Sequence, residues 1–361
     1  MSAPDTVIAS AGLVTPIGLS LAETAASARA RVARLREIPW MDRRFEPFIV
    51  GRVPDDGLPD LAEALHGQPL QYREARMLRL AHAALEEAMA GWLKRQAEDK
   101  ASGQPLPLLL GLPEQHTTQP LNPQAFLARL NQQCPGHIDV ARSLAVPRGR
   151  AAGLMALREA RARLQRGDCE AILVGGVDCL VDLYVLGTLD LQGRVRNEVN
   201  SDGFSPSEGA AFLLLTRADV AQRHGLKPLA GLMGTALAQE PGHLYADAPY
   251  RGEGLAAAFA ALVQECPPPS PIGCVYSSFN GERYWASEYG VARLRQTQAF
   301  LPEHAMEHPA ECFGDLGSAH GAALAALAAH GVQQGYRAAP CLVYASSDHG
   351  DRAASLLAHA S

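Results

Sequence analysis

Two short stretches of the sequence bring together residue types that can do chemistry. The segment Ser346-Ser-Asp-His349 holds the hydroxyl, carboxylate and imidazole groups of a hydrolase. The chain has no Gly-x-Ser-x-Gly turn, however, and neighbouring side chains on an extended segment point apart, so a loop is the better interpretation. His304 and His308 are four residues apart, as metal ligands on a helix can be, but the order His-Glu-x-x-His is absent. We expect an exposed helix face there, and no metal.

The seven cysteines form neither a disulfide framework nor a zinc site, because their number is odd and no Cys-x-x-Cys pair occurs. We therefore expect reduced thiols in a cytoplasmic protein. Four of them open, lie in or directly follow predicted buried strands, where thiols are usually inert: Cys169, Cys179, Cys274 and Cys341. Cys134 and Cys312 fall in loop-like sequence, and Cys312 is the least unfavourable candidate for a nucleophile. An inert thiol remains the better interpretation for all seven.

Length and composition are those of an ordinary globular protein. The 361 residues correspond to roughly 2.4 average domains, and 47% hydrophobic against 19% charged residues suffices for a full core. A net charge of −6 and the lack of an apparent basic run argue against a nucleic-acid partner. The first residues lack a basic stretch followed by an apolar run, and no apolar segment approaches about 18 residues, so we expect neither an export signal nor a membrane span.

Hydrophobic periodicity predicts alternating strands and helices in the first 222 residues. Between Arg73 and Arg95, apolar residues recur every three or four positions, the pattern of a helix with one buried face. The apolar run Glu170–Asp178 follows a helix and the turn Arg166-Gly-Asp168, and it is typical of a fully buried strand. The prediction is helices at 19–30, 73–95 and 153–165, strands from 6 and at 105–113, 170–178 and 210–216, and irregular chain at 38–72 and about 114–137.

The remaining residues repeat this plan. Strands are predicted at 229–238, 273–278 and 340–346, and helices at 254–265, 285–295 and 321–330. The last helix follows the glycine-bearing segment Gly314-Asp-Leu-Gly-Ser-Ala-His-Gly321, and this ending resembles residues 149–176 in plan. Alternating helices and strands indicate an α/β protein. We expect two similar halves, residues 1–222 and 223–361.

Four segments together resemble the β-ketoacyl synthases of the thiolase superfamily. They are Gly12–Gly18, the helix at 73–95, residues 153–176, and Asp202-Gly-Phe-Ser-Pro-Ser-Glu-Gly-Ala210. The last is the most specific, because the family has Asp-Gly-Phe and then Gly-Glu-Gly-Ala before a buried strand, and only Ser207 departs from it. The resemblance covers nearly the whole chain. It implies a thiolase-like five-layered αβαβα fold with two similar halves, usually dimeric.

The nucleophile of that family is missing. In the family a cysteine lies at the start of a buried helix, where backbone N–H groups and the helix dipole lower its pKa. Counting from Gly153 and Gly167 places this position at Arg150, and a guanidinium cannot form a thioester. A positive side chain there also opposes the helix dipole, unless an acidic group or a bound anion compensates for it.

The two histidines of the family, which stabilise the developing oxyanion, are missing as well. The comparison places Asn280 at the first position and Ser318 at the second, and Phe313 replaces the nearby lysine. His320 comes two residues late, about 200° further round a helix. The C-terminal glycine-rich loop is reduced to Asp348-His-Gly-Asp-Arg-Ala353. The joint loss indicates lost catalytic chemistry.

A vestigial pocket could remain where these segments converge in the parent fold. Arg148 and Arg150 could hold a phosphate or carboxylate at the helix start, although internal ion pairs with Asp or Glu are the better interpretation. The other polar side chains could form a replacement site, or could be ordinary buried groups with satisfied hydrogen bonds. The residues predicted to line such a pocket are Arg148, Arg150, Asn280, Glu282, Ser318, His320 and His349.

The resemblance therefore implies a catalytically inactive accessory protein without a cofactor. Degenerate ketosynthase-like proteins that resemble this one accompany bacterial type VI secretion effectors, and we expect an adaptor or chaperone for such an effector. Two alternatives stay open. One is a chain-length-factor-like partner of an active ketosynthase and its acyl carrier; the other is an acyl-transforming enzyme that uses Asn280, Glu282 or His320. We expect a cytoplasmic homodimer.

Overall fold

The computed structural model describes residues 4–98, 104–115 and 120–360. The elements up to residue 223 are β1 (Thr6–Val14), α1 (Leu21–Arg29), β2 (Leu35–Met41), β3 (Pro47–Gly51), α2 (Tyr72–Glu98), β4 (Leu108–Leu112), α3 (Pro123–Gln133), β5 (Leu144–Pro147), α4 (Ala152–Arg166), β6 (Ala171–Cys179), α5 (Leu183–Leu191), β7 (Glu208–Arg217) and α6 (Ala218–Arg223). The later elements are β8 (Ala230–Gln239), α7 (Glu253–Glu265), β9 (Ile272–Ser277), α8 (Arg283–Arg295), β10 (Phe300–Glu307), α9 (Ala310–Phe313), α10 (His320–Gln333), β11 (Cys341–Ser346) and β12 (Asp351–Ala358).

Two sets of five strands have the same topology. The first runs β5-β4-β6-β7-β1 and the second β10-β9-β11-β12-β8, and they join where β1 pairs antiparallel with β8. In the first set β1, β7 and β6 pair antiparallel, whereas β6, β4 and β5 pair parallel. The second set repeats these directions, with β8, β12 and β11 antiparallel and β11, β9 and β10 parallel. Strand order and direction therefore recur along the chain.

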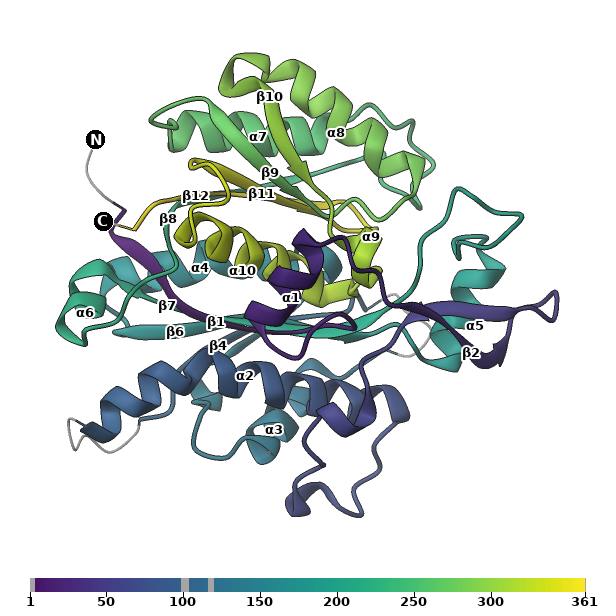
Figure 1. Cartoon of the computed structure of the whole chain (residues 1–361), viewed down its shortest axis with the longest axis horizontal. Coiled ribbons are helices and arrows are strands. Elements are labelled where there is room, and N and C mark those ends of the chain that lie inside the picture. The colour runs from purple at the N-terminus through teal and green to yellow at the C-terminus, as the bar shows by residue number, and fades with distance from the viewer. Residues whose placement is uncertain (1–3, 99–103, 116–119, 361) are drawn as a thin grey trace.

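The helices lie in three layers around the two strand sets (Figure 1). Helices α2 and α3 cover the outer face of the first set, and α7 and α8 cover the outer face of the second. Helices α4 and α10 lie between the two sets, where they form the central core cluster. The result is the αβαβα arrangement of a thiolase-like fold. Among the described helices, none combines the length and the apolar character that crossing a membrane requires.

The central layer depends on small residues where α4 and α10 cross. A Cβ atom on Gly321 would lie 2.6 Å from the carbonyl oxygen of Arg150, and one on Gly153 would lie 2.8 Å from the backbone nitrogen of Ala322. Helix α10 is alanine-rich and buried on nearly every side, as expected for a helix between two sheets. Close backbone contact therefore brings the starts of the two helices together.

Two segments that the sequence predicted as irregular contain regular structure. Residues 38–72 include most of the hairpin β2–β3. The sequence pattern did not indicate these strands, because they are short and β2 contains a proline. The Gln- and Asn-rich stretch before residue 137 contains α3. That helix is capped by Asn122, whose side chain accepts a hydrogen bond from the Ala125 N–H at 3.0 Å, and Pro123 opens its first turn. Helix α5, for which no element was predicted, is a further difference.

The C-terminal region corrects two more predictions. The segment with His304 and His308 is not a helix face, because residues 300–307 form β10 beside β9. The predicted final strand at 340–346 is followed by β12, which pairs with both β11 and β8. The charged start of β12 hid its burial: Arg352 is fully buried because its guanidinium pairs with the buried Glu288. A buried ion pair interrupts the apolar pattern by which buried strands are predicted.

Candidate functional site

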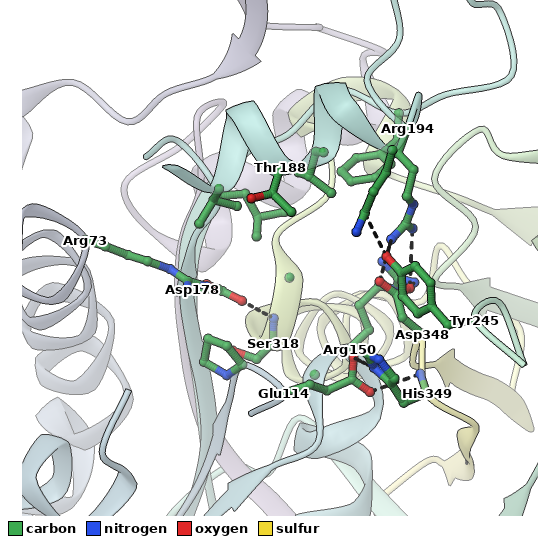
Figure 2. Close-up of a pocket in the computed structure, with 18 residues that line it drawn as sticks. Arg73, Glu114, Arg150, Asp178, Thr188, Arg194, Tyr245, Ser318, Asp348 and His349 are labelled. Atoms are coloured by element: carbon green, nitrogen blue, oxygen red, sulfur yellow. Dashed lines mark hydrogen bonds and ion pairs between the residues drawn. The ribbon is translucent and has the colours of Figure 1, made fainter. Parts of the chain in front are cut away.

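A cavity of about 230 Å³ lies where α4 and α10 begin. In Figure 2, Thr188 of α5 lies on one side of this cavity, and Arg150, Glu114 and His349 lie on the opposite side. Carboxylates and guanidinium groups alternate around the wall, between apolar side chains from α5 and the loops beside it. Segments far apart in the sequence therefore meet around one space.

The two helices approach the cavity through matching turns. Residues Gly149–Ala151 and Gly317–Ala319 each form one 3₁₀ turn that leads directly into α4 and α10. Each turn begins with a glycine whose φ is positive, +62° in the first and +54° in the second, a conformation that favours glycine. Arg150 and Ser318 are the second residues of these turns. The same backbone geometry thus presents a guanidinium in one half and a hydroxyl in the other.

Arg150 is buried, and protein groups bind its guanidinium. Its Nη1 donates to Asp315 Oδ2 at 2.8 Å, its Nε donates to the Ser346 carbonyl at 3.0 Å, and its Nη2 pairs with Asp348. The guanidinium also lies over the Trp285 ring, 4.7 Å from its centroid. The charge that opposes the dipole of α4 is therefore compensated by two aspartates from the second half of the chain.

A second buried arginine extends this network. Arg194 forms a bidentate pair with Glu282, with both N–O distances 2.8 Å, and its Nη1 lies 2.6 Å from Asp348 Oδ2. The same Nη1 donates to the Tyr245 hydroxyl at 2.9 Å. Asp348 thereby bridges the guanidinium groups of Arg150 and Arg194. We call Arg150, Arg194, Glu282, Asp315 and Asp348 the charge network.

Asp315 is the most enclosed member of the charge network. Its Oδ2 accepts from Asn280 Nδ2 at 2.8 Å as well as from Arg150, and its Oδ1 accepts from the Gly317 N–H at 2.9 Å. His320 Nδ1 lies 3.5 Å from Oδ1 and accepts a hydrogen bond from the Leu316 N–H at 3.3 Å. Asn280 therefore donates to this carboxylate and His320 lies beside it, and neither one lines the cavity.

Mutual attraction favours the charged forms of Asp348, Asp315 and Arg150 in this network. Burial alone would raise the pKa of Asp348, but the nearby guanidinium groups of Arg150 and Arg194 outweigh it and lower that pKa to about 2. Asp315 is likewise buried, and Arg150 holds its pKa well below the ordinary value. Burial would lower the pKa of Arg150, yet Asp348 and Asp315 raise it above the ordinary value. The two aspartates therefore favour the charged form of the Arg150 guanidinium.

Glu114 forms a separate contact at the cavity wall. Its carboxylate accepts from the His349 backbone N–H at 3.2 Å and lies 3.0 Å from His349 Nδ1. Burial raises the pKa of Glu114, and the nearby Asp348 raises it further. Arg148, by contrast, is largely exposed, and its guanidinium lies 3.5 Å from Asp351, outside the cavity lining.

The structure brings most of the residues predicted for the pocket into one region. Arg150, Ser318 and His349 line the cavity, whereas Asn280, Glu282 and His320 belong to the polar contacts behind it, and Arg148 lies outside. Ser318 uses its hydroxyl to donate to the Val177 carbonyl at 2.8 Å. Internal partners, and not an open binding surface, therefore occupy most of these side chains.

Sequence reasoning missed several residues that define the site: Glu114, Arg194, Tyr245, Asp315 and Asp348 as ion-pair or hydrogen-bond partners. One signal was available, because an arginine at the start of a buried helix requires nearby carboxylates. Asp315 and Asp348 both stand in the glycine-containing segments that the sequence already placed near the parent site. The pairing of these two aspartates with Arg150 could have been inferred, but the pairing of Arg194 with Glu282 and Asp348 could not.

The cysteines and the spaced histidines are placed elsewhere. No cysteine lines the cavity in the part of the chain that the structure describes. Cys312 is buried in α9, where burial raises the pKa of its thiol. His304 instead contacts the Tyr289 hydroxyl at 2.7 Å, and the described residues contain no group of three or more side chains suited to a metal.

Sequence comparison connects part of the chain to known enzymes. The model of the family "Beta-ketoacyl synthase, N-terminal domain" matches residues 140–221. The polyketide synthase component PikAIII of Streptomyces venezuelae is 36% identical over 105 residues, which is 27% of this chain and 7% of that protein. A 6-methylsalicylic acid synthase of Arthrobotrys oligospora is 34% identical over 105 residues, 27% of this chain and 6% of that protein. The chain thus spans less than a tenth of these curated relatives.

Solved ketosynthases share the fold over nearly the whole chain. An oxazolomycin ketosynthase domain of Streptomyces albus superposes with a TM-score of 0.78 at 17% identity, over 99% of this chain and 75% of that one. A ketosynthase in complex with its chain length factor, from Xenorhabdus doucetiae, gives 0.75 at 16% identity, over 99% and 98%. At such identities the similarity establishes the fold, while function has to be argued from the site.

Proposed function

We propose that this chain, which is a β-ketoacyl synthase-like protein with the thiolase-superfamily fold, is catalytically inactive and acts as a binding scaffold for a protein partner. The observation that carries the proposal is the state of Arg150. Its guanidinium stands where the resemblance places the nucleophile, and Asp315 and Asp348 neutralise it inside the protein. A guanidinium with these partners cannot accept an acyl group.

The positions that correspond to the two histidines support the same proposal. The side-chain amide of Asn280 donates hydrogen bonds to Asp315 and Glu282, and the hydroxyl of Ser318 donates to a backbone carbonyl. Neither group is free to stabilise a negative charge that develops in the cavity. The acyl-transforming alternative is also weakened, because Glu282 is committed to Arg194 and His320 lies behind Asp315. Loss of the chemistry with retention of the fold favours a binding role.

The partner that we propose is a bacterial type VI secretion effector, for which the protein would act in the cytoplasm as an adaptor or chaperone. The support is the sequence resemblance to degenerate ketosynthase-like proteins that accompany such effectors. A chain-length-factor-like role beside an active ketosynthase is the second candidate, favoured by the structural similarity to the Xenorhabdus doucetiae complex. We further propose a homodimer of chains with two halves, 1–222 and 223–361, in which the end strand β5 pairs with its copy.

The chemical part of the proposal is tested with acyl and malonyl thioesters. The purified protein is incubated with each, and intact mass, thioester hydrolysis and carbon dioxide release are measured beside an active ketosynthase. We expect no covalent adduct, no hydrolysis and no decarboxylation. An Arg150→Cys variant that remains folded by circular dichroism is expected to stay unable to condense, because the histidine positions hold Asn280 and Ser318. Turnover by the unmodified protein would refute inactivity.

The binding part is tested by affinity purification from the native cell extract. Recovery of a toxin or a secretion-spike component in a fixed ratio supports the adaptor role. Recovery of an active ketosynthase or an acyl carrier supports the chain-length-factor-like role instead. Light scattering on the purified protein gives the oligomeric state, and a monomeric mass would exclude the homodimer.

A further inference from the structure

A short basic segment follows α1 in an otherwise acidic protein. Residues 29–36 contain four arginines, Arg29, Arg31, Arg34 and Arg36, and no acidic residue. The whole chain has a net charge of −6, so the other 353 residues together carry −10. All four arginines are exposed. The expectation that the chain has no basic run therefore overlooked this segment, because the net charge of the whole chain conceals a local group of arginines.

Most of these guanidinium groups lack a carboxylate partner. Arg31 pairs with Glu311 of α9, and Arg29 lies over the Tyr336 ring, 4.1 Å from its centroid. Arg34 and Arg36 form no ion pair and no side-chain hydrogen bond with any residue that the structure describes. Arg34 directly precedes β2 and Arg36 is the second residue of that strand, so the two cations lie close together along the chain. Exposed arginines elsewhere in the chain commonly have an acidic neighbour, as Arg166 and Arg223 do.

A groove adjoins Arg34, one of these cations. It has a volume of about 450 Å³ and is lined by Arg34, by the turn Thr15–Leu19 and by one side of α1. Its walls are partly apolar, and the side chain of Leu19 is 39% exposed. Val32, within the basic segment, is 41% exposed. The one carboxylate in the wall, Glu23, already accepts a hydrogen bond from the Leu19 N–H at 2.8 Å. Positive charge and exposed apolar surface thus occur side by side.

We propose that the basic segment 29–36 and the adjoining groove form a docking surface for an acidic, partly apolar segment of a protein partner. This inference rests on the proposed function as a binding scaffold and names the chemistry of its partner. Carboxylates of the partner pair with Arg34 and Arg36, and an apolar side chain enters the groove beside Leu19. Arginine suits this role because its planar guanidinium binds carboxylates in bidentate fashion.

A protein segment fits this surface better than other polyanions. A nucleic acid or an anionic membrane presents charge over a wide area, and the net −10 of the remaining residues repels such a surface. Bases also need aromatic faces for stacking, but Arg29 and Arg337 both lie over the ring of Tyr336, the aromatic residue next to the segment. A short acidic peptide covers less of the acidic remainder than a nucleic acid or a membrane surface does.

The test uses the full chain and a defined probe. A fluorescently labelled peptide of alternating Glu and Leu is titrated with the protein at low and at physiological ionic strength, and anisotropy is recorded. The double variant R34E/R36E is compared with R158E/R251E, which makes the same charge change at two exposed arginines outside the segment. We expect R34E/R36E to weaken binding about tenfold or more, and the control pair to change it by less than about twofold. A peptide with Gln in place of Glu should bind neither protein.

Three results would overturn the docking surface: no binding of the acidic peptide, equal weakening in both double variants, or tighter binding of single-stranded DNA or phosphatidylserine vesicles. A second measurement separates this inference from the proposed function. If the unmodified protein and R34E/R36E capture the same stoichiometric partner equally well, the scaffold role stands and the surface is wrong. If the unmodified protein captures nothing, the scaffold role fails, and the peptide titration still decides the surface.

Discussion

The starts of α4 and α10 occupy equivalent places in the two halves of the strand topology, but the charges placed at them are opposite. At α10 the positive end of the helix meets a carboxylate, because the Ser318 N–H donates to Asp178 Oδ2 at 2.9 Å. At α4 the second residue of the turn is itself a cation, and Arg150 reaches Asp315 and Asp348 for compensation. One backbone turn therefore accommodates a neutral hydroxyl or a buried guanidinium.

This difference shows which part of the site the fold requires. The turn needs its leading glycine and the small residue three positions after Arg150 or Ser318, because the helices cross there at backbone contact. The second residue is not fixed by the backbone. The residue type there depends on the side chains that surround it. We therefore expect loss of the second residue's side chain to change protein stability very differently at the two helix starts.

The largest effect is expected from Arg150→Met, which keeps the volume of the side chain and removes its charge. Asp315 and Asp348 would then be buried with one guanidinium fewer, and unpaired buried charges typically destabilise a protein by about 3–5 kcal/mol. Chemical denaturation monitored by circular dichroism measures this change. The control Arg150→Lys keeps the charge and should recover part of the loss. A stability within about 1 kcal/mol of the unmodified protein for Arg150→Met would show that the charge network is not needed.

A somewhat smaller effect is expected where the helices cross. Gly321→Ala places a Cβ atom 2.6 Å from the Arg150 carbonyl oxygen, a backbone atom that cannot turn away, so we expect a loss of about 2–3 kcal/mol. Gly91→Ala is the matched control, because it lies inside α2 with no atom within 4 Å of the new Cβ. There the substitution should raise stability by about 0.5–1 kcal/mol. Equal stability of the two variants would contradict the close crossing.

Acid should weaken the charge network through Asp348. In the folded chain the pKa of Asp348 is about 2, against an ordinary value of 3.8, because Arg150 and Arg194 favour the carboxylate. Its contribution is therefore complete above the ordinary value and is lost as the pH falls from about 4 to about 2. By linkage it amounts to about 2 kcal/mol. Stability measured against pH should fall less steeply in this range for Asp348→Asn, and an unchanged slope would contradict the assignment.

Much of the fold could be predicted from the sequence, because its signals are local. The helix at 73–95 has one apolar stripe, and the strands at 170–178 and 210–216 are apolar runs, and all three appear within a few residues of their predicted ends. Elements with mixed composition were lost. Helix α3 depends on its Asn122 cap and its packing against α2, and β12 contains the charged Asp351 and Arg352. Burial of a charge depends on partners that are distant in the sequence.

The site was predictable only in outline for the same reason. Family resemblance located Arg150, Asn280 and Ser318, and the dipole of α4 indicated that an acidic group or a bound anion compensates the charge of Arg150. The sequence could not say that Arg194 shares Asp348 with Arg150, because Asp348 lies 154 positions from Arg194 and 198 positions from Arg150 along the chain. Pairing across the two halves is a property of the folded chain, and single-sequence patterns do not contain it.

The smallest effect is expected at the neutral helix start. Ser318→Ala removes one buried hydroxyl that donates to the Val177 carbonyl at 2.8 Å, and leaves the backbone N–H on Asp178 unchanged. A single neutral hydrogen bond contributes about 1 kcal/mol, so the loss should be a third or less of that for Arg150→Met. Denaturation of the two variants under the same conditions gives this ratio directly. If Ser318→Ala destabilised the protein as much as Arg150→Met, the two turns would be equally constrained. Charge compensation alone would then not explain why the second residues of the two turns differ. The buried carboxylates around Arg150 would have to be explained by binding and not by folding.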